Sequence, residues 1–286
     1  MTGPHFAILA DGRRHFQHGP IDLVIEAFGP VTAVAAAYAA AERRFQAVLN
    51  ELVAELWLLR RPLADERLWL DGPVARRMIA ACWPYRDRFI TPMAAVAGAV
   101  ADEILAAMRA AGALDRIYVN NGGDIALHLA PGQRFDIGVA ASPDPRSNAA
   151  LAGRVSVLAG DGIGGIATSG RGGRSFSLGI ADAVTVLAGD AASADAAATM
   201  IGNAVDIDHP AVRRAPASSI KDDTDLGGRL VTTGLGTLPE PAIAEALGRG
   251  EARAQALLDA GLIAGAVLLL RGRHRVVGRI ALPLAA

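Results

Sequence analysis

Short strand-like segments alternate with long helical ones along this sequence, a pattern compatible with an α+β fold. The 286 residues are 52% hydrophobic and 20% charged, a balance typical of a globular protein with a substantial core. The net charge is −1, without a basic tail or stripe, so the sequence gives no support to nucleic-acid binding. Its longest apolar runs, 31–41 and 260–270, are well short of the roughly 20 residues of a membrane span.

Two residue counts limit the chemistry. Cys82 is the only cysteine, which excludes an intrachain disulfide and a cysteine-based zinc site. Lys221 is the only lysine, which removes most mechanisms that use a lysine nucleophile. The first residues lack the pattern of a signal peptide, and we expect a cytoplasmic protein that does not associate with membranes.

The first third of the chain predicts strands followed by helices. Strand patterns flank and follow the Asp11-Gly12 turn, at 6–10, 14–17 and 21–28. Apolar residues at three- and four-residue steps predict a helix over 31–60, and Pro73 opens a short one that ends near residue 83. In a third helix, over 88–111, Thr91 is expected to act as N-cap and Pro92 to take the first position.

The remainder predicts mostly strands around two helices. The strand patterns lie at 117–120, 125–129, 135–140 and 229–235, with a terminal hairpin over 264–282. Further strands are predicted in the first part of segment 155–205. The last part of this segment is predicted to form a helix of small residues. The second helix covers 239–260.

Two glycine-containing turns are candidate ligand sites. In Asn120-Asn121-Gly122-Gly123-Asp124 the glycines permit close approach to a ligand, and Asp124 is either a turn residue or a binding group. The corner Thr168-Ser169-Gly170 lacks the first glycine of a hydrolase elbow. The glycines before it lack dinucleotide-loop spacing, which argues against a Rossmann fold. Arg171 and Arg174, set among glycines, are either phosphate-binding or solvated.

Asp195 and Thr199 lie four residues apart in the small-residue helix. This spacing places both side chains on one helix face, where their oxygens could help to hold a hard cation such as Mg²⁺. On spacing alone, capping of the helix or exposure to water explains the same pair.

Three motifs, taken in order, resemble the ApbE family, the FAD:protein FMN transferases. They are Val119-Asn120-Asn121-Gly122-Gly123-Asp124, Ala167-Thr168-Ser169-Gly170 and Ala194-Asp195-Ala196-Ala197-Ala198-Thr199. The similarity extends upstream to about Met93, where Gly98 and Asp102 match a family helix. It covers roughly half of the chain.

The resemblance implies a mostly antiparallel sheet covered by helices, related to the T-fold. It implies a single domain over 1–286 with two interlocked halves, about 1–115 and 116–286. It also implies Mg²⁺ at Asp195 and Thr199, and FAD or FMN as a small-molecule ligand in a protein that could form a homodimer. The flavin-binding positions would be Gly98, Asn121, Gly122, Gly123, Thr168, Ser169, Gly170, Arg171 and Arg174.

The chain also departs from the family pattern. Ala97 stands where the family has a flavin-contacting lysine, and the histidine-rich segment after Thr-Ser-Gly is absent. A catalytic base could instead be Asp182 or Asp124. Three hypotheses therefore remain: a Mg²⁺-dependent flavin or nucleotide transferase or hydrolase acting on FAD, a non-catalytic flavin- or pterin-binding protein, and an accessory protein that keeps the pocket for structure.

Overall fold

The structure, a computed structural model, describes residues 3–66, 68–140, 151–173 and 175–280. The chain divides into two compact units. Unit 1 comprises Met1–Phe135, Val157–Ala167 and Ala188–Asp195, and unit 2 comprises Asp136–Ser156, Thr168–Leu187 and Ala196–Ala286. The chain passes from one unit to the other within several elements, among them strand β8 (Gly165–Ser169) and helix α5 (Ala191–Ala204). The predicted halves, meeting near residue 115, stay a prediction.

The sheet of unit 1 is antiparallel. Its strands follow the order β1-β2-β3-β4-β5-β8, and each neighbouring pair is antiparallel. The first five are β1 (His5–Ile8), β2 (Arg14–His18), β3 (Ile21–Phe28), β4 (Arg116–Asn121) and β5 (Asp124–Leu129). Along β3, Ile21, Leu23 and Ile25 are buried while the residues between them are more exposed, so one face of the sheet is the core face.

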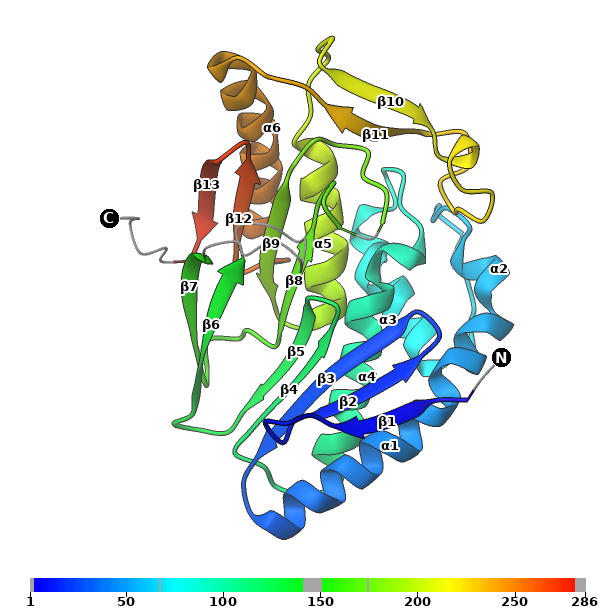
Figure 1. Cartoon of the computed structure of the whole chain (residues 1–286), viewed down its shortest axis with the longest axis vertical. Helices are drawn as coiled ribbons and strands as arrows, with labels where there is room; N and C mark the ends of the chain where they lie inside the picture. Colours follow the sequence, from blue (N-terminus) through cyan, green and yellow to red (C-terminus); the bar gives the residue numbers. More distant parts are fainter. Residues whose placement is uncertain (1–2, 67, 141–150, 174, 281–286) are drawn as a thin grey trace. The chain divides into compact units, whose positions relative to one another are not determined.

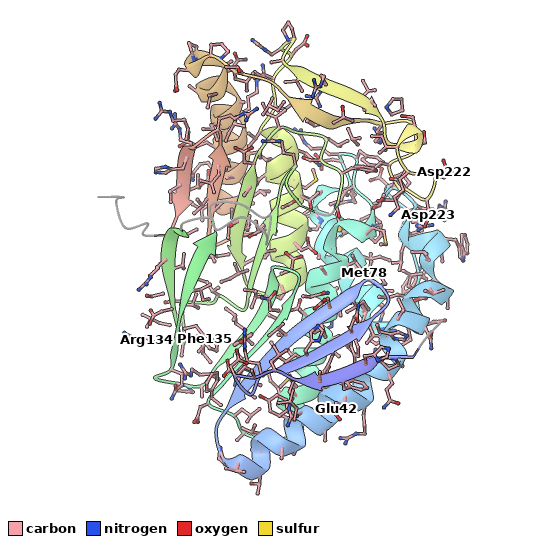
Figure 2. The ribbon with its side chains drawn as sticks, in the orientation of Figure 1. Glu42, Met78, Arg134, Phe135, Asp222 and Asp223 are labelled. Carbon is pink, nitrogen blue, oxygen red and sulfur yellow. The ribbon has the colours of Figure 1, made fainter. Side chains whose placement is uncertain are left out.

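Helices cover the core face of this sheet (Figure 1). Helix α1 contacts β2 and β3, and α4 contacts β4, β5, α1 and α3. The helical elements of unit 1 are α1 (Val31–Ala54), α2 (Leu56–Leu59), α3 (Pro73–Cys82), η1 (Trp83–Tyr85), η2 (Pro92–Ala95) and α4 (Val96–Ala110). Figure 2 shows Met78 of α3 among these helices, where its side chain is fully buried.

Two helices differ from their predicted form. The helix predicted over 31–60 is interrupted at Glu55, between α1 and α2. The helix predicted over 88–111 begins as the 3₁₀ turn η2, and Ala95, at φ −126° and ψ 14°, separates it from α4. Thr91 takes the N-cap position, as predicted, but of η2 and not of α4, and its side chain makes no cap hydrogen bond. The break gives α4 its own N-terminus at Val96, with backbone N–H groups that need acceptors.

Unit 2 also combines antiparallel strands with a helical layer. Strands β9, β12 and β13 are neighbours in that order, and helix α6 contacts β12 and β13. Strand β9 is buried along its whole length. The remaining elements are β6 (Arg134–Ala140), β7 (Leu151–Leu158), β9 (Ala183–Ala188), β10 (Val212–Pro216), η3 (Ala217–Ser219), β11 (Leu230–Leu235), α6 (Glu240–Asp259), β12 (Gly265–Leu270) and β13 (Arg273–Gly278). The predicted α+β class, with antiparallel sheet covered by helices, is confirmed.

Candidate functional site

In unit 1, the carboxylate of Asp195 lies at the N-terminus of α4. Its Oδ2 atom accepts the backbone N–H of Gly98 at 3.1 Å, and the N–H of Ala97 also stabilises the carboxylate. These donors belong to the first turn of α4, where backbone N–H groups have no partner within the helix. The break at Ala95 therefore creates the donors that hold Asp195.

Gly98 allows α4 and the start of α5 to pack closely. A Cβ atom at Gly98 would lie 2.2 Å from the carbonyl oxygen of Ala191 and 2.7 Å from the nitrogen of Ala192. The resemblance predicts a flavin contact for Gly98, and that role stays a prediction. What the position demonstrably requires is a residue without a side chain, since any Cβ would collide with backbone atoms.

The carboxylate of Asp124, at the start of β5, is the second acid near Asp195. Burial raises the pKa of Asp195 well above its usual range, and repulsion from Asp124 raises it further. The N–H groups of Gly98 and Ala97 lower this pKa, but they are the smaller effects. Because two nearby carboxylates disfavour each other's ionisation, a cation bound between them would be stabilised by both negative charges.

The predicted glycine turn ends at Asp124 and contacts the first turn of α4. Asn121 is buried, and its side-chain NH₂ group donates to the carbonyl oxygen of Ala97 at 3.1 Å. The turn itself is closed by the N–H of Gly123, which donates to the side-chain oxygen of Asn120 at 2.8 Å. Gly122 and Gly123 have φ values of 65° and 112°, so both positions favour glycine for conformational reasons.

Cys82 belongs to the surroundings of Asp195, which sequence reasoning missed. Its thiol is fully buried and lies 3.5 Å from the carbonyl oxygen of Thr91. Burial raises the pKa of the Cys82 thiol, and the charge of Asp195 adds to the rise. The thiol is thus kept protonated, as expected of a small buried hydrophobic residue. No sequence signal relates Cys82 to an aspartate more than a hundred positions away.

In unit 2, the hydroxyl groups of the Thr168-Ser169 corner each meet another hydroxyl. Thr168 Oγ1 lies 2.9 Å from Oγ1 of Thr185 on β9, and Ser169 Oγ lies 3.4 Å from Oγ1 of Thr199 on α5. The contact between Ser169 and Thr199 brings together two of the motifs singled out in the sequence. Alcohol oxygens of this kind can serve as hydrogen-bond partners or as hard ligands.

Arg171 and Asp182 form an ion pair in unit 2. Asp182 Oδ1 accepts from Nε and Nη2 of Arg171, at 2.9 and 2.5 Å, and Oδ2 accepts the backbone N–H of Arg271. The third member, Arg271, was missed; its only sequence signal is the Arg-Gly-Arg turn of the terminal hairpin. Arg174, predicted to bind phosphate, lies outside the described residues.

Asp195 and Thr199 both belong to α5. Because the helix is continuous over Ala191–Ala204, their spacing places them on one helix face. Both side chains are partly accessible. Within the described ranges, no three His, Cys, Asp or Glu side chains are grouped so that they could hold a metal ion. The metal assignment of this pair therefore stays a prediction.

Two hollows of about 440 and 340 Å³ lie in unit 2. The larger is lined by Arg154, Val155, Ser156, Gly278, Arg279 and Ile280, and the smaller by residues of 206–214 and Arg249. Neither includes a predicted site residue. In the part of the chain that the structure describes, no helix is long and apolar enough to cross a membrane.

Comparisons with known proteins place this α+β chain in a family. The model of the family described as AbpE bacteria matches residues 6–276, and the chain belongs to this family. The resemblance to ApbE proteins that the motifs indicated is thereby confirmed.

Relatives at the sequence level carry the name UPF0280 protein. One from Methanothrix thermoacetophila is 38% identical over 189 residues, which are 65% of this chain and 74% of that protein. One from Methanosarcina acetivorans is 39% identical over 162 residues, 56% of this chain and 60% of that protein. Among solved structures, a mutant of the flavin transferase ApbE from Vibrio cholerae is similar over 97% of this chain and 98% of its own, with a TM-score of 0.50. At 12% identity this likeness shows the fold alone.

Proposed function

We propose that this protein binds a flavin nucleotide and acts as a Mg²⁺-dependent transferase or hydrolase on FAD. The name of the Vibrio cholerae structure, a flavin transferase, supports the choice of flavin. The observation that carries the proposal is the pair of contacts made by α5. Asp195 contacts Gly98 at the start of α4, and Thr199 contacts Ser169 at the end of β8. Helix α5 thus carries Asp195, which contacts Gly98, and Thr199, which contacts the Thr168-Ser169-Gly170 corner.

The residues at Asp195 suit a hard divalent cation. The carboxylate of Asp195, the neighbouring carboxylate of Asp124 and the hydroxyl of Thr199 are oxygen donors, the kind that Mg²⁺ prefers. Burial and repulsion from Asp124 raise the pKa of Asp195. A bound cation would compensate the negative charge of the two carboxylates. Asp195 and Thr199 are the residues that would hold Mg²⁺, which when bound would neutralise the diphosphate of FAD.

In the proposed reaction a hydroxyl oxygen attacks the phosphorus atom of the FMN half of FAD. A new P–O bond forms, the P–O bond to AMP breaks, and the proton of the hydroxyl leaves to a base. With water as the attacking group the products are FMN and AMP. Asp124 would act as the base that takes this proton, since its carboxylate lies near Asp195.

The test is release of AMP from FAD. Purified protein is incubated with FAD in MgCl₂ or in EDTA, and AMP and FMN are separated by chromatography. We expect AMP only with Mg²⁺, and a loss of at least a hundredfold for Asp195→Asn. Asp222→Asn is the matched control, because Asp222 lies in the loop after η3 (Figure 2) with an exposed side chain.

Two results would change the proposal. If FAD or FMN binds but no AMP is released, the protein is a flavin-binding module, as the alanine at position 97 would allow. If FAD and FMN do not bind and do not raise the melting temperature of the protein, the flavin assignment fails.

A further inference from the structure

The Asp182 carboxylate in unit 2 already uses both of its oxygens. Oδ1 accepts two N–H groups of Arg171, and Oδ2 accepts the backbone N–H of Arg271. A proton on this carboxylate would weaken the charge-assisted hydrogen bonds that it accepts, because a neutral carboxyl group is a poorer acceptor. Its present arrangement is that of a group that orients an arginine.

The main chain also fixes Arg171. Its backbone N–H donates to the carbonyl oxygen of Ala181 at 2.9 Å. The preceding Gly170 has φ 149°, and a Cβ atom there would lie 2.6 Å from the carbonyl oxygen of Asp182. Glycine at this corner therefore lets the Arg171 backbone lie against the 181–183 segment. Arg171 is thus held at its backbone by Ala181 and at its guanidinium by Asp182, while 30% of the side chain stays exposed.

The local charge is unbalanced in favour of the arginines. The Arg271 side chain donates to the carbonyl oxygens of Leu235 and Gly236, which are neutral. Its backbone has φ 51°, a left-handed conformation in the turn between β12 and β13. Among the described hydrogen bonds, the Arg171 guanidinium thus has one carboxylate, Asp182, and the Arg271 guanidinium has none. An anion would restore the balance.

Arg171 keeps donors for such an anion. A guanidinium has five N–H groups, and the two bonds to Asp182 leave three, including both on Nη1. This planar set matches the oxygens of a phosphate, and its orientation is fixed in advance by Asp182.

We propose that Asp182 is a positioning residue that holds the Arg171 guanidinium to bind a phosphate or diphosphate group. The identity of the natural ligand as the diphosphate of FAD rests on the proposed function, whereas the anion site does not. In this arrangement Asp182 acts through Arg171 and accepts no proton during turnover.

Calorimetric titration with inorganic pyrophosphate and, separately, with FAD tests the site without needing turnover. We expect Arg171→Gln to weaken binding of pyrophosphate at least tenfold and Asp182→Asn to weaken it severalfold. Arg171→Lys, which keeps the charge but loses the planar fork, should fall between wild type and Arg171→Gln. Arg214→Gln is the matched control, since Arg214 pairs with Asp206 elsewhere in unit 2, and it should bind like wild type. Circular dichroism melts check that each variant is folded.

The outcomes separate this inference from the proposed function. Loss of pyrophosphate affinity in Arg171→Gln, with no FAD binding by any form, supports the anion site and contradicts the flavin proposal. Unchanged affinity for both probes in Arg171→Gln overturns the inference. So does an Asp182→Asn variant that binds normally but loses the acid limb of the kcat–pH profile, because that result makes Asp182 the base. If Asp182→Asn raises the KM for FAD and keeps the acid limb of the kcat–pH profile, the result supports the positioning role of Asp182.

Discussion

Asp102 on α4 and Asp195 on α5 each bind the N-terminus of the other's helix. The buried carboxylate of Asp102 accepts the backbone N–H groups of Ala191 and Ala192 at 3.0 and 2.8 Å, and Asp195 accepts that of Gly98 at 3.1 Å. Each carboxylate thus meets the partial positive charge of a helix N-terminus. The reciprocal contacts, together with Gly98, hold the two helix starts together in unit 1.

Replacing Asp102 by alanine should destabilise the protein strongly. Two buried N–H groups at the start of α5 would lose their acceptors, at a cost of roughly 2–4 kcal/mol in the free energy of unfolding. Asp190→Ala is the matched control: the exposed side chain of Asp190 accepts the N–H of Ser193, and its loss should cost about 1 kcal/mol. Urea unfolding measures both, and equal losses would contradict the buried role of Asp102.

The same carboxylate should make stability depend on pH. Burial raises the pKa of Asp102 from 3.8 to about 6, so the native state holds this proton more tightly than the unfolded chain does. The free energy of unfolding should therefore fall as pH rises from about 4 to about 6, by up to about 3 kcal/mol from this group. Asp102→Asn removes the titration. Unfolding midpoints at several pH values should show a flatter profile for the variant, and identical profiles would refute the assignment.

Gly98→Ala should disrupt the packing of α4 against α5. The added Cβ would meet the backbone of Ala191, which cannot turn aside as a flexible side chain could, and we expect a loss of about 3 kcal/mol. The control is Gly248→Ala in α6, where a Cβ has no neighbour within 4 Å. There the better helix propensity of alanine should stabilise the protein by roughly 0.5–1 kcal/mol. Thermal melts distinguish the two, and opposite signs are expected.

Asp124→Asn should lower the pKa of Asp195. The substitution removes the negative charge of Asp124 but keeps a side chain of similar shape, so part of the repulsion that disfavours ionised Asp195 disappears. Carboxyl carbon NMR during a pH titration follows Asp195 directly. Asp222→Asn serves as the reference, because it makes the same charge change in an exposed loop. If the pKa of Asp195 shifts no more in Asp124→Asn than in Asp222→Asn, Asp124 and Asp195 do not interact.

Local patterns in the sequence were sufficient to place most helices and strands and the three motifs. The exact start of α4 was not predictable, because Thr91-Pro92 is by itself a good start for a helix. The actual start follows the break at Ala95, and its backbone N–H groups donate to Asp195, which is distant in sequence. Likewise, Asp102 binds Ala192, 90 positions away, and Asp182 binds the backbone of Arg271, 89 positions away. Such contacts depend on tertiary structure, and residue spacing within a helix or a turn does not predict them.

Asp195, in the proposed function, helps to hold a cation that supports flavin binding. The most direct test of this role is titration of FAD, followed by flavin fluorescence, with wild-type protein and Asp195→Asn in MgCl₂ and in EDTA. We expect Mg²⁺ to raise the affinity of the wild type for FAD at least tenfold and to leave that of Asp195→Asn unchanged. Equal affinities for FAD with and without Mg²⁺ in the wild type would contradict this role.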